Sequence, residues 1–313
     1  MTPSAHPVVW LHHAGQHLGL VPTLGGSVAA WQIDVPHARI DLWRSWDGVT
    51  PDLYQLASFP LVPWSNRISG GGFTHDGQFH AMRPNRAGEP YPIHGDGWLQ
   101  TWQIAQPAPD TVVMTLESHG FNASPYEYHA TQTFRLVEGG LDQQLQVRHL
   151  GDKTLPYGLG VHPWFPRTPM TRIRAPVQGV WLSGKDPLPV RHTHDFPPGW
   201  DLNNGVKAHG PLIDNGYTGW GGKACITWPE RGMQLHAEMP DFEHDGAAAQ
   251  HFCLIYRPPK GPAFCFEPIT QPIDAFHLPR RPGLRVLREG MICSLNIRWR
   301  VETFPPLRGA GSR

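Results

Sequence analysis

Short apolar segments, separated by turns that contain glycine or proline, follow one another along almost the whole chain. In Ile40-Asp41-Leu42-Trp43-Arg44 apolar and polar residues alternate, and residues 291–301 show the same period of two. This period is typical of a β-strand with one buried face. We expect two further strands at 126–136 and 141–150, which Glu138-Gly139-Gly140 joins as a hairpin turn. The pattern therefore predicts β-structure from one end of the chain to the other.

The composition supports this prediction and limits the helix content. Of the 313 residues, 34 are glycine and 34 are proline, the two poorest helix formers. We expect a short helical turn over residues 52–56 and a long irregular segment over residues 184–220, which is rich in Pro, Gly, Asn and His. No linker divides the chain, and its strands differ in length. The sequence therefore predicts one all-β domain over residues 1–304, an antiparallel β-sandwich rather than a barrel, with a flexible tail at 305–313.

The charge balance argues against two classes of partner. Lys plus Arg and Asp plus Glu number 26 each, so the net charge is zero and nothing draws the chain to nucleic acid or to an anionic membrane. No apolar run is long enough to span a bilayer, and residues 1–6 lack the pattern of a signal peptide. The four cysteines form no CxxC pair, which is typical of reduced core thiols. We expect a cytoplasmic protein.

One carboxylate stands out within the apolar segment 264–270. Glu267 is flanked by Phe266 and followed at once by Pro268. A carboxylate on a rigid strand with little water around it is a place where proteins shift a pKa for proton transfer. The ordinary structural explanation is a strand-end Glu that pairs with an arginine.

Four other motifs carry polar residues that do not fit their surroundings. They are Ser65-Asn66-Arg67, His94 within residues 92–98, His162 within residues 160–165, and Asp214 within residues 212–217. An amide and a guanidinium recognise sugar hydroxyls or brace a carboxylate. Each motif also has an ordinary explanation: the chain has 19 histidines, and Asn215-Gly216 is a common turn sequence that Asp214 would cap.

Taken together and in this order, the five motifs resemble those of the aldose 1-epimerase (galactose mutarotase) family. The resemblance covers about residues 8–303 and includes the His-Gly element at His94 with its Trp98, and the His-Pro-aromatic-Phe element at His162. One departure is Trp164, where the family often has tyrosine. The resemblance implies a large antiparallel β-sandwich of the galactose mutarotase type, a supersandwich, and the interconversion of α and β anomers of an aldose without a cofactor or metal.

The resemblance also implies a role for each matching residue. Glu267 would be the base that takes the proton of the anomeric hydroxyl, and His162 the acid that protonates the ring oxygen. Arg67, His94, Asp214 and Asn66 would hold sugar hydroxyls. Elementary chemistry agrees, since mutarotation removes a proton from O1 and delivers one to O5. We expect an ionised Glu267 and a protonated His162 on opposite sides of the sugar ring, and a neutral aldose such as galactose or glucose as substrate.

Two other readings remain open at this point. A sugar-binding or sugar-sensing protein without catalysis can use the same fold. A metal-dependent hydrolase is suggested by His192-Thr193-His194-Asp195, although no further ligands are evident and no HExxH occurs. Neither a P-loop nor a GxGxxG follows a strand, which disfavours nucleotide binding. The sequence does not distinguish a monomer from a homodimer.

Overall fold

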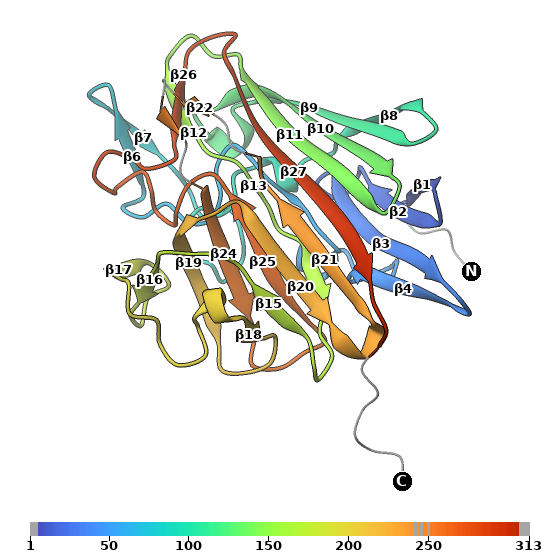
Figure 1. Ribbon diagram of the computed structural model, residues 1–313. Coiled ribbons are helices and arrows are strands. Elements are labelled where there is room, and N and C mark those ends of the chain that lie inside the picture. The colour runs from blue at the N-terminus through green and yellow to red at the C-terminus, as the bar shows by residue number, and fades with distance from the viewer. Residues whose placement is uncertain (1–5, 241–242, 245–246, 249–250, 307–313) are drawn as a thin grey trace.

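The computed structural model describes residues 6–240, 243–244, 247–248 and 251–306, and β-strands dominate this part of the chain (Figure 1). The largest sheet has nine strands in the order β18 (Val206–Lys207), β15 (Arg172–Arg174), β20 (Lys223–Trp228), β21 (Met233–Glu238), β27 (Ile292–Thr303), β11 (Gly140–His149), β10 (Glu127–Val137), β9 (Thr111–His119) and β8 (Gln103–Ala108). Its ladders are antiparallel throughout.

A second large sheet is also antiparallel. Its order is β17 (Pro189–Thr193), β16 (Gly179–Ser183), β19 (Ile213–Trp220), β24 (His251–Arg257), β25 (Ala263–Ile269), β13 (Gly160–Val161) and β5 (Pro60–Leu61), and β14 (Trp164–Pro166) also pairs with β25. A four-stranded sheet comprises β1 (Val9–His13), β2 (Gln16–Val21), β3 (Ser27–Val35) and β4 (Ala38–Trp43).

The remaining elements are short. Three two-stranded ladders are β6 (Gly72–His75) with β7 (Gln78–Ala81), β12 (Leu155–Tyr157) with β26 (Arg285–Leu287), and β22 (Glu243–His244) with β23 (Ala247–Ala248). The helical elements are single 3₁₀ turns: η1 (Leu53–Gln55), η2 (Gly97–Leu99), η3 (Phe121–Ala123), η4 (Leu202–Asn204) and η5 (Pro229–Arg231). Within the described part of the chain, no helix has the length and apolar character needed to cross a membrane.

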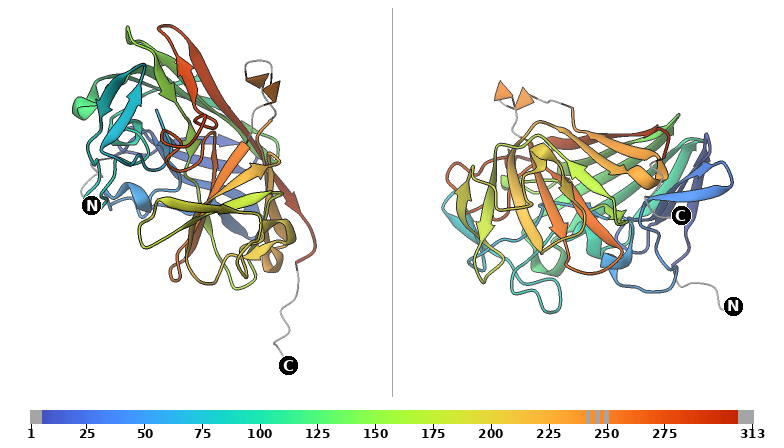
Figure 2. Two further views of the ribbon diagram at one scale, coloured as in Figure 1. Left: turned by 90° about the vertical axis from the view of Figure 1, so that its left-hand side faces the viewer. Right: turned by 60° about the horizontal axis from the view of Figure 1, so that its bottom comes forward.

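The two large sheets form layers around a shared apolar core (Figures 1 and 2). Phe165 of β14 and Trp299 of β27 lie in different sheets, and their ring centroids are 6.0 Å apart. Trp43 joins the four-stranded sheet to the same core, since its ring meets that of Trp299 edge to face at 5.3 Å. The predicted all-β antiparallel sandwich with very little helix is confirmed.

Most of the expected elements lie where the sequence predicts them. The hairpin at residues 138–139 joins β10 to β11, the strand expected at 291–301 is β27, and the helical turn at 52–56 is η1. The tail expected at 305–313 lies mostly outside the described residues, and the domain limits stay a prediction.

The expectation of an irregular segment over residues 184–220 is wrong in part. It contains β17, β18 and β19, and Asn215-Gly216 lies within β19 rather than in a turn. Gly216 pairs with Leu254 in the ladder, and the Asn215 side chain is buried, donating to the backbone oxygen of Trp181 at 2.8 Å. β19 pairs with β16 on one side and with β24 on the other, and this pairing overrides the turn preference of Asn215-Gly216.

The contact between Trp43 and Trp299 predicts that the four-stranded sheet unfolds together with the large sheets. Trp43 is fully buried, so Trp43→Ala should lower the free energy of unfolding by about 3–5 kcal/mol. Trp10→Ala is the matched control, because Trp10 is 42% exposed on the same sheet and should change stability by about 0.5 kcal/mol or less. Urea unfolding followed by fluorescence measures both. Equal effects of the two substitutions would contradict this account of the core.

Candidate active site

The register of three neighbouring strands brings a set of side chains to one face of the eight-stranded sheet. Glu267 on β25 lies opposite Leu254 on β24, and Tyr256 on β24 lies opposite Asp214 on β19. Residues directly opposite each other point to the same face, and residues two apart on a strand share that face. Phe266, the residue before Glu267 on β25, points to the opposite face of the sheet and into the core. Strand alternation alone therefore carries Glu267, Tyr256 and Asp214 to one surface.

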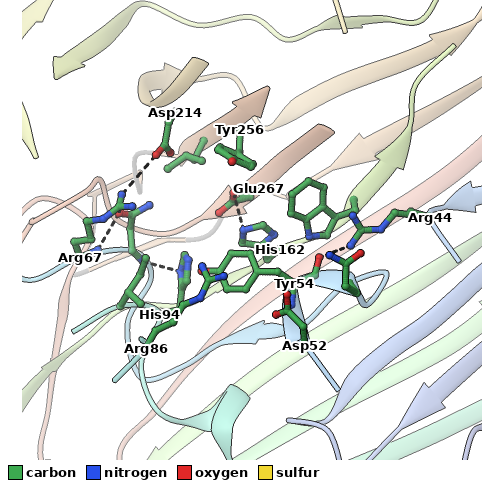
Figure 3. A pocket seen from close by; sticks show the side chains of 15 residues that line it. Arg44, Asp52, Tyr54, Arg67, Arg86, His94, His162, Asp214, Tyr256 and Glu267 are labelled. Atoms are coloured by element: carbon green, nitrogen blue, oxygen red, sulfur yellow. Dashed lines mark hydrogen bonds and ion pairs between the residues drawn. The ribbon is translucent and has the colours of Figure 1, made fainter. Parts of the chain in front are cut away.

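That surface forms part of a cavity of about 330 Å³ (Figure 3). All six site residues predicted from the sequence line it: Asn66, Arg67, His94, His162, Asp214 and Glu267. Figure 3 shows Glu267 and His162 together in the middle, with Arg67 and Asp214 toward one end and Arg44 toward the other. The structure thus brings together residues that are up to 201 positions apart, from Asn66 to Glu267.

The closest polar contact in the middle of the cavity joins the predicted acid and base. Glu267 Oε1 lies 3.3 Å from His162 Nε2, and the two side chains are 1% and 4% exposed. His162 follows β13, where its backbone N–H donates to the oxygen of Phe59 at 3.1 Å and its ring stacks on the Phe59 ring at 4.5 Å. The two groups are in direct contact. The expectation that they lie on opposite sides of a sugar ring is therefore wrong for this arrangement.

Burial controls the protonation of this pair. Removal from water raises the pKa of Glu267 well above its usual range; the charge of Asp214 adds to this effect and that of Arg67 opposes it. Burial, with smaller effects from the charges of Arg44 and Arg86, lowers the pKa of His162 to about 3. The expected ion pair of carboxylate and imidazolium is disfavoured, because burial favours one proton on the carboxyl and a neutral imidazole.

Arg67 is fixed at one end of the cavity by two carboxylates. Its Nε and Nη2 each donate to Glu89 at 3.0 Å, and its Nη1 lies 3.8 Å from Asp214 Oδ2. The Asn66 Oδ1 accepts from the backbone N–H of Arg67 at 2.9 Å and from its Nη1 at 3.3 Å. A two-point contact with Glu89 holds the planar guanidinium in one orientation. Asn66 therefore positions Arg67 besides lining the cavity.

His94 has a defined tautomer. Its Nδ1 accepts the backbone N–H of Asn66 at 3.1 Å, and burial, together with His162 and Arg67, lowers its pKa well below the usual range. A neutral imidazole whose Nδ1 accepts carries its proton on Nε2, so His94 is a hydrogen-bond donor there. Gly95 follows with φ +71°, and a Cβ at this position would lie 2.0 Å from the oxygen of Val62. Only glycine permits this close approach.

Several lining residues were not predicted from the sequence. They are Arg44, Asp52, Tyr54, Gln55, Arg86, Ile93, Leu254 and Tyr256, whereas Trp164, which the sequence marks as a departure from the family pattern, also lines the cavity. The Arg86 guanidinium lies 3.5 Å from the centre of the Tyr54 ring, and that of Arg44 lies 4.3 Å from the Trp164 ring. Tyr256 could have been found from strand alternation beside Glu267. Arg44, Tyr54 and Arg86 occupy segments with no motif, and only the fold brings them to the cavity.

The part of the chain that the structure describes contains one group of three side chains that could hold a metal ion. His192 and His194 of the expected HxH element bond Thr218 and the oxygen of Gln178 and join no group of three potential ligands. The one such group is His162, Cys265 and Glu267, whose donor atoms lie within 4.8 Å of one another. It coincides with the acid–base pair. Burial raises the pKa of the Cys265 thiol well above its usual range, which disfavours the thiolate that a metal needs.

Comparison with known proteins supports one family. A sequence model of the aldose 1-epimerase family matches residues 8–245. The uncharacterised protein YphB of Escherichia coli K12 is 33% identical over 260 residues, which cover 82% of this chain and 86% of that protein.

Solved structures agree with this assignment. A candidate aldose 1-epimerase from Escherichia coli K12 superposes with a TM-score of 0.86 at 28% identity, covering 96% of this chain and 100% of that one. A galactose mutarotase-like protein from Clostridium acetobutylicum has a TM-score of 0.79 at 19% identity, with 96% of each chain covered, and shows the shared fold. The sequence match over three quarters of the chain, together with this fold, shows that the chain belongs to the aldose 1-epimerase family.

Proposed function

We propose that the protein is an aldose 1-epimerase that interconverts the α and β anomers of a neutral aldose such as galactose or glucose. The observation that supports this most directly is the 3.3 Å contact of Glu267 with His162 inside a cavity lined by hydrogen-bonding side chains. Mutarotation needs one group that accepts a proton and one that donates a proton, both near the anomeric carbon.

The proposed reaction proceeds through the open-chain sugar. Glu267 takes the proton of the anomeric hydroxyl while His162 gives a proton to the ring oxygen, so the C1–O5 bond breaks and O1 becomes a carbonyl oxygen. Rotation about C1–C2 presents the other face of the carbonyl. The ring oxygen then attacks C1, and both protons return to the groups from which they came. No redox change occurs, and the pair ends in its starting state.

The protonation state fits this scheme because the pair holds a single proton in either form. Burial favours a protonated Glu267 and a neutral His162, whereas the reaction starts from carboxylate and imidazolium. One proton transfer over 3.3 Å converts the first form to the second without exchange with water. Among the described residues, Glu267 Oε2 has no hydrogen-bond partner, which leaves it available to a sugar hydroxyl.

The other residues serve as sugar-binding groups in this proposal. Arg67 and the Nε2–H of His94 donate hydrogen bonds, and Asp214 accepts them. Burial raises the pKa of Asp214 and Arg67 opposes this effect, so the neighbouring guanidinium favours the carboxylate form that accepts. Asn66 holds Arg67 in position.

Glu267→Gln should abolish anomerisation and leave sugar binding measurable, because the amide keeps the shape of the side chain but cannot take the proton. We expect the rate to fall by about 10²–10⁴-fold. Polarimetry of freshly dissolved α-glucose and α-galactose, corrected for the spontaneous reaction, measures the rate, and calorimetry measures binding.

Glu117→Gln is the control, since this carboxylate is exposed on β9. Near-wild-type rates for Glu267→Gln would sink the acid–base assignment. Sugar binding by the wild-type protein with no measurable anomerisation would leave it a sugar binder only.

The pH dependence of kcat/KM should show a wide plateau. As the pH falls through about 3, His162 takes up a proton while Glu267 keeps its own. The pair then holds two protons and no longer contains a base. As the pH rises through the raised pKa of Glu267, the pair loses its only proton and the acid is lost. Between these limits the pair keeps one proton, so kcat/KM should be nearly constant from above about pH 3 up to the raised pKa of Glu267. A tenfold fall per pH unit below about 4.3, typical of an unperturbed glutamate that must be ionised, would contradict the pairing.

A further inference from the structure

A cavity of about 410 Å³ lies beside β18, the edge strand of the nine-stranded sheet (Figure 1). Residues from β15, from the segment 198–211 and from the end of β24 line this β18 cavity, and none of them lines the proposed sugar site. Its volume is within the range of small-molecule sites. The β18 cavity is therefore a separate place where the protein could hold a ligand.

Positive charge predominates in the β18 cavity. Arg172, Lys207 and Arg257 line it together with His209, and Asp201 supplies the one carboxylate of the lining. Asp201 already accepts hydrogen bonds from three amide N–H groups of η4. Within the described part of the chain, none of the three Arg and Lys side chains forms an ion pair with a carboxylate. The lining thus lacks a counter-charge of its own.

Arg257 places a buried guanidinium at this cavity. The residue is 3% exposed, and its Nε donates to the oxygen of Pro211 at 3.0 Å. Its Nη1 donates to the oxygens of Lys207 at 2.9 Å and Gly199 at 3.4 Å. These bonds fix the guanidinium, whereas Nη2 donates to no acceptor among the described residues and is available to a ligand. A buried charge is costly unless a charged or hydrogen-bonding partner compensates for it.

A pair of like charges lies across from each other in the same lining. Arg172 on β15 and Lys207 on β18 are directly opposite in the antiparallel ladder, and both are exposed. Like charges in this position repel each other and cost stability. The Arg172 Nη2 donates to the oxygen of Gly205 at 2.8 Å, which keeps the guanidinium at the rim of the cavity. An anion bound beside the two side chains would remove the repulsion.

We infer that the β18 cavity binds the phosphate group of a small phosphorylated metabolite. The guanidinium groups of Arg172 and Arg257 match a phosphate in charge and in the fork-shaped arrangement of their donors, and Lys207 adds a mobile point charge. The rest of the cavity volume is available to the remainder of the metabolite. A carboxylate ligand would present fewer oxygens and less charge to the same set of donors.

The inference is independent of the proposed function. Tyr256 lines the sugar site, and Arg257, the next residue on β24, lines the β18 cavity. Successive residues of a strand face opposite sides of the sheet, so β24 separates the two places. A ligand in the β18 cavity would therefore not occupy the site of Glu267 and His162.

Arg172→Gln and Lys207→Gln test this site, because both side chains are exposed and their replacement opens no cavity in the core. Calorimetric titration with glycerol 3-phosphate and with inorganic phosphate, in chloride buffer of constant ionic strength, measures the dissociation constants. We expect the wild-type protein to bind glycerol 3-phosphate more tightly than inorganic phosphate. Each substitution should weaken the binding of glycerol 3-phosphate by about tenfold, since it removes one charged hydrogen-bond donor.

Arg148→Gln is the matched control. Arg148 is also exposed on the nine-stranded sheet and forms no ion pair among the described residues, but it does not line the β18 cavity. This substitution changes the net charge equally and should alter the dissociation constant by less than about twofold, because salt screens distant surface charges. Urea unfolding checks the fold, and the midpoint of Lys207→Gln should be unchanged or higher, since one of two opposed like charges is gone.

Three results would overturn the inference. The first is a wild-type protein that binds neither probe. The second is an equal loss of affinity in Arg148→Gln and in the two cavity variants, which would show attraction by overall charge without a site. The third is inorganic phosphate binding as tightly as glycerol 3-phosphate, which would leave a site for the free ion only. The titrations involve no sugar, so the outcome is separate from that of the anomerisation assays.

Discussion

The contact between Glu267 and His162 is the constraint on which the arrangement of the site depends. Two titratable groups in a nearly dry environment cannot both take or both release a proton at low cost, so they share one. The surrounding structure must keep water out and keep the atoms within reach of each other. Phe59 supports this by stacking on the imidazole, and β25 by fixing the carboxyl on a strand buried along its whole length.

Charged residues near the pair have opposing effects on its proton affinity. Asp214 pushes the pKa of Glu267 up, and Arg67 pushes it down, while Arg67 is itself held by Glu89. The chain of alternating charges from Glu89 to Glu267 means that a change in any member alters the proton affinity of the pair. The proposed sugar-binding groups, Arg67 and Asp214, and the proposed acid–base pair are therefore one electrostatic unit, since the charges of the first two act on the pKa of Glu267.

The sequence predicted much of this fold because strand alternation and turn residues are local properties. It predicted the six site residues because their motifs occur in a family order, and Glu267 also because its apolar neighbours are visible in the chain. The strand that carries Asp214 was not predicted, since the strands that pair with it are remote in sequence. Arg44 and Arg86 had no local indication at all. The burial that disfavours the ion pair was not predicted, because it depends on which segments pack above the two residues.

The placement of Glu267, Tyr256 and Asp214 on three adjacent strands has an evolutionary consequence. A one-residue slip of β25 would turn Phe266 toward the cavity and Glu267 into the core, so insertions in this strand are excluded. The loop that carries Arg86 is under no such restriction, because it runs from β7 to η2 and does not join two paired strands. The loop residues that line the cavity can therefore diverge between relatives while Glu267, Tyr256 and Asp214 keep their places on the sheet.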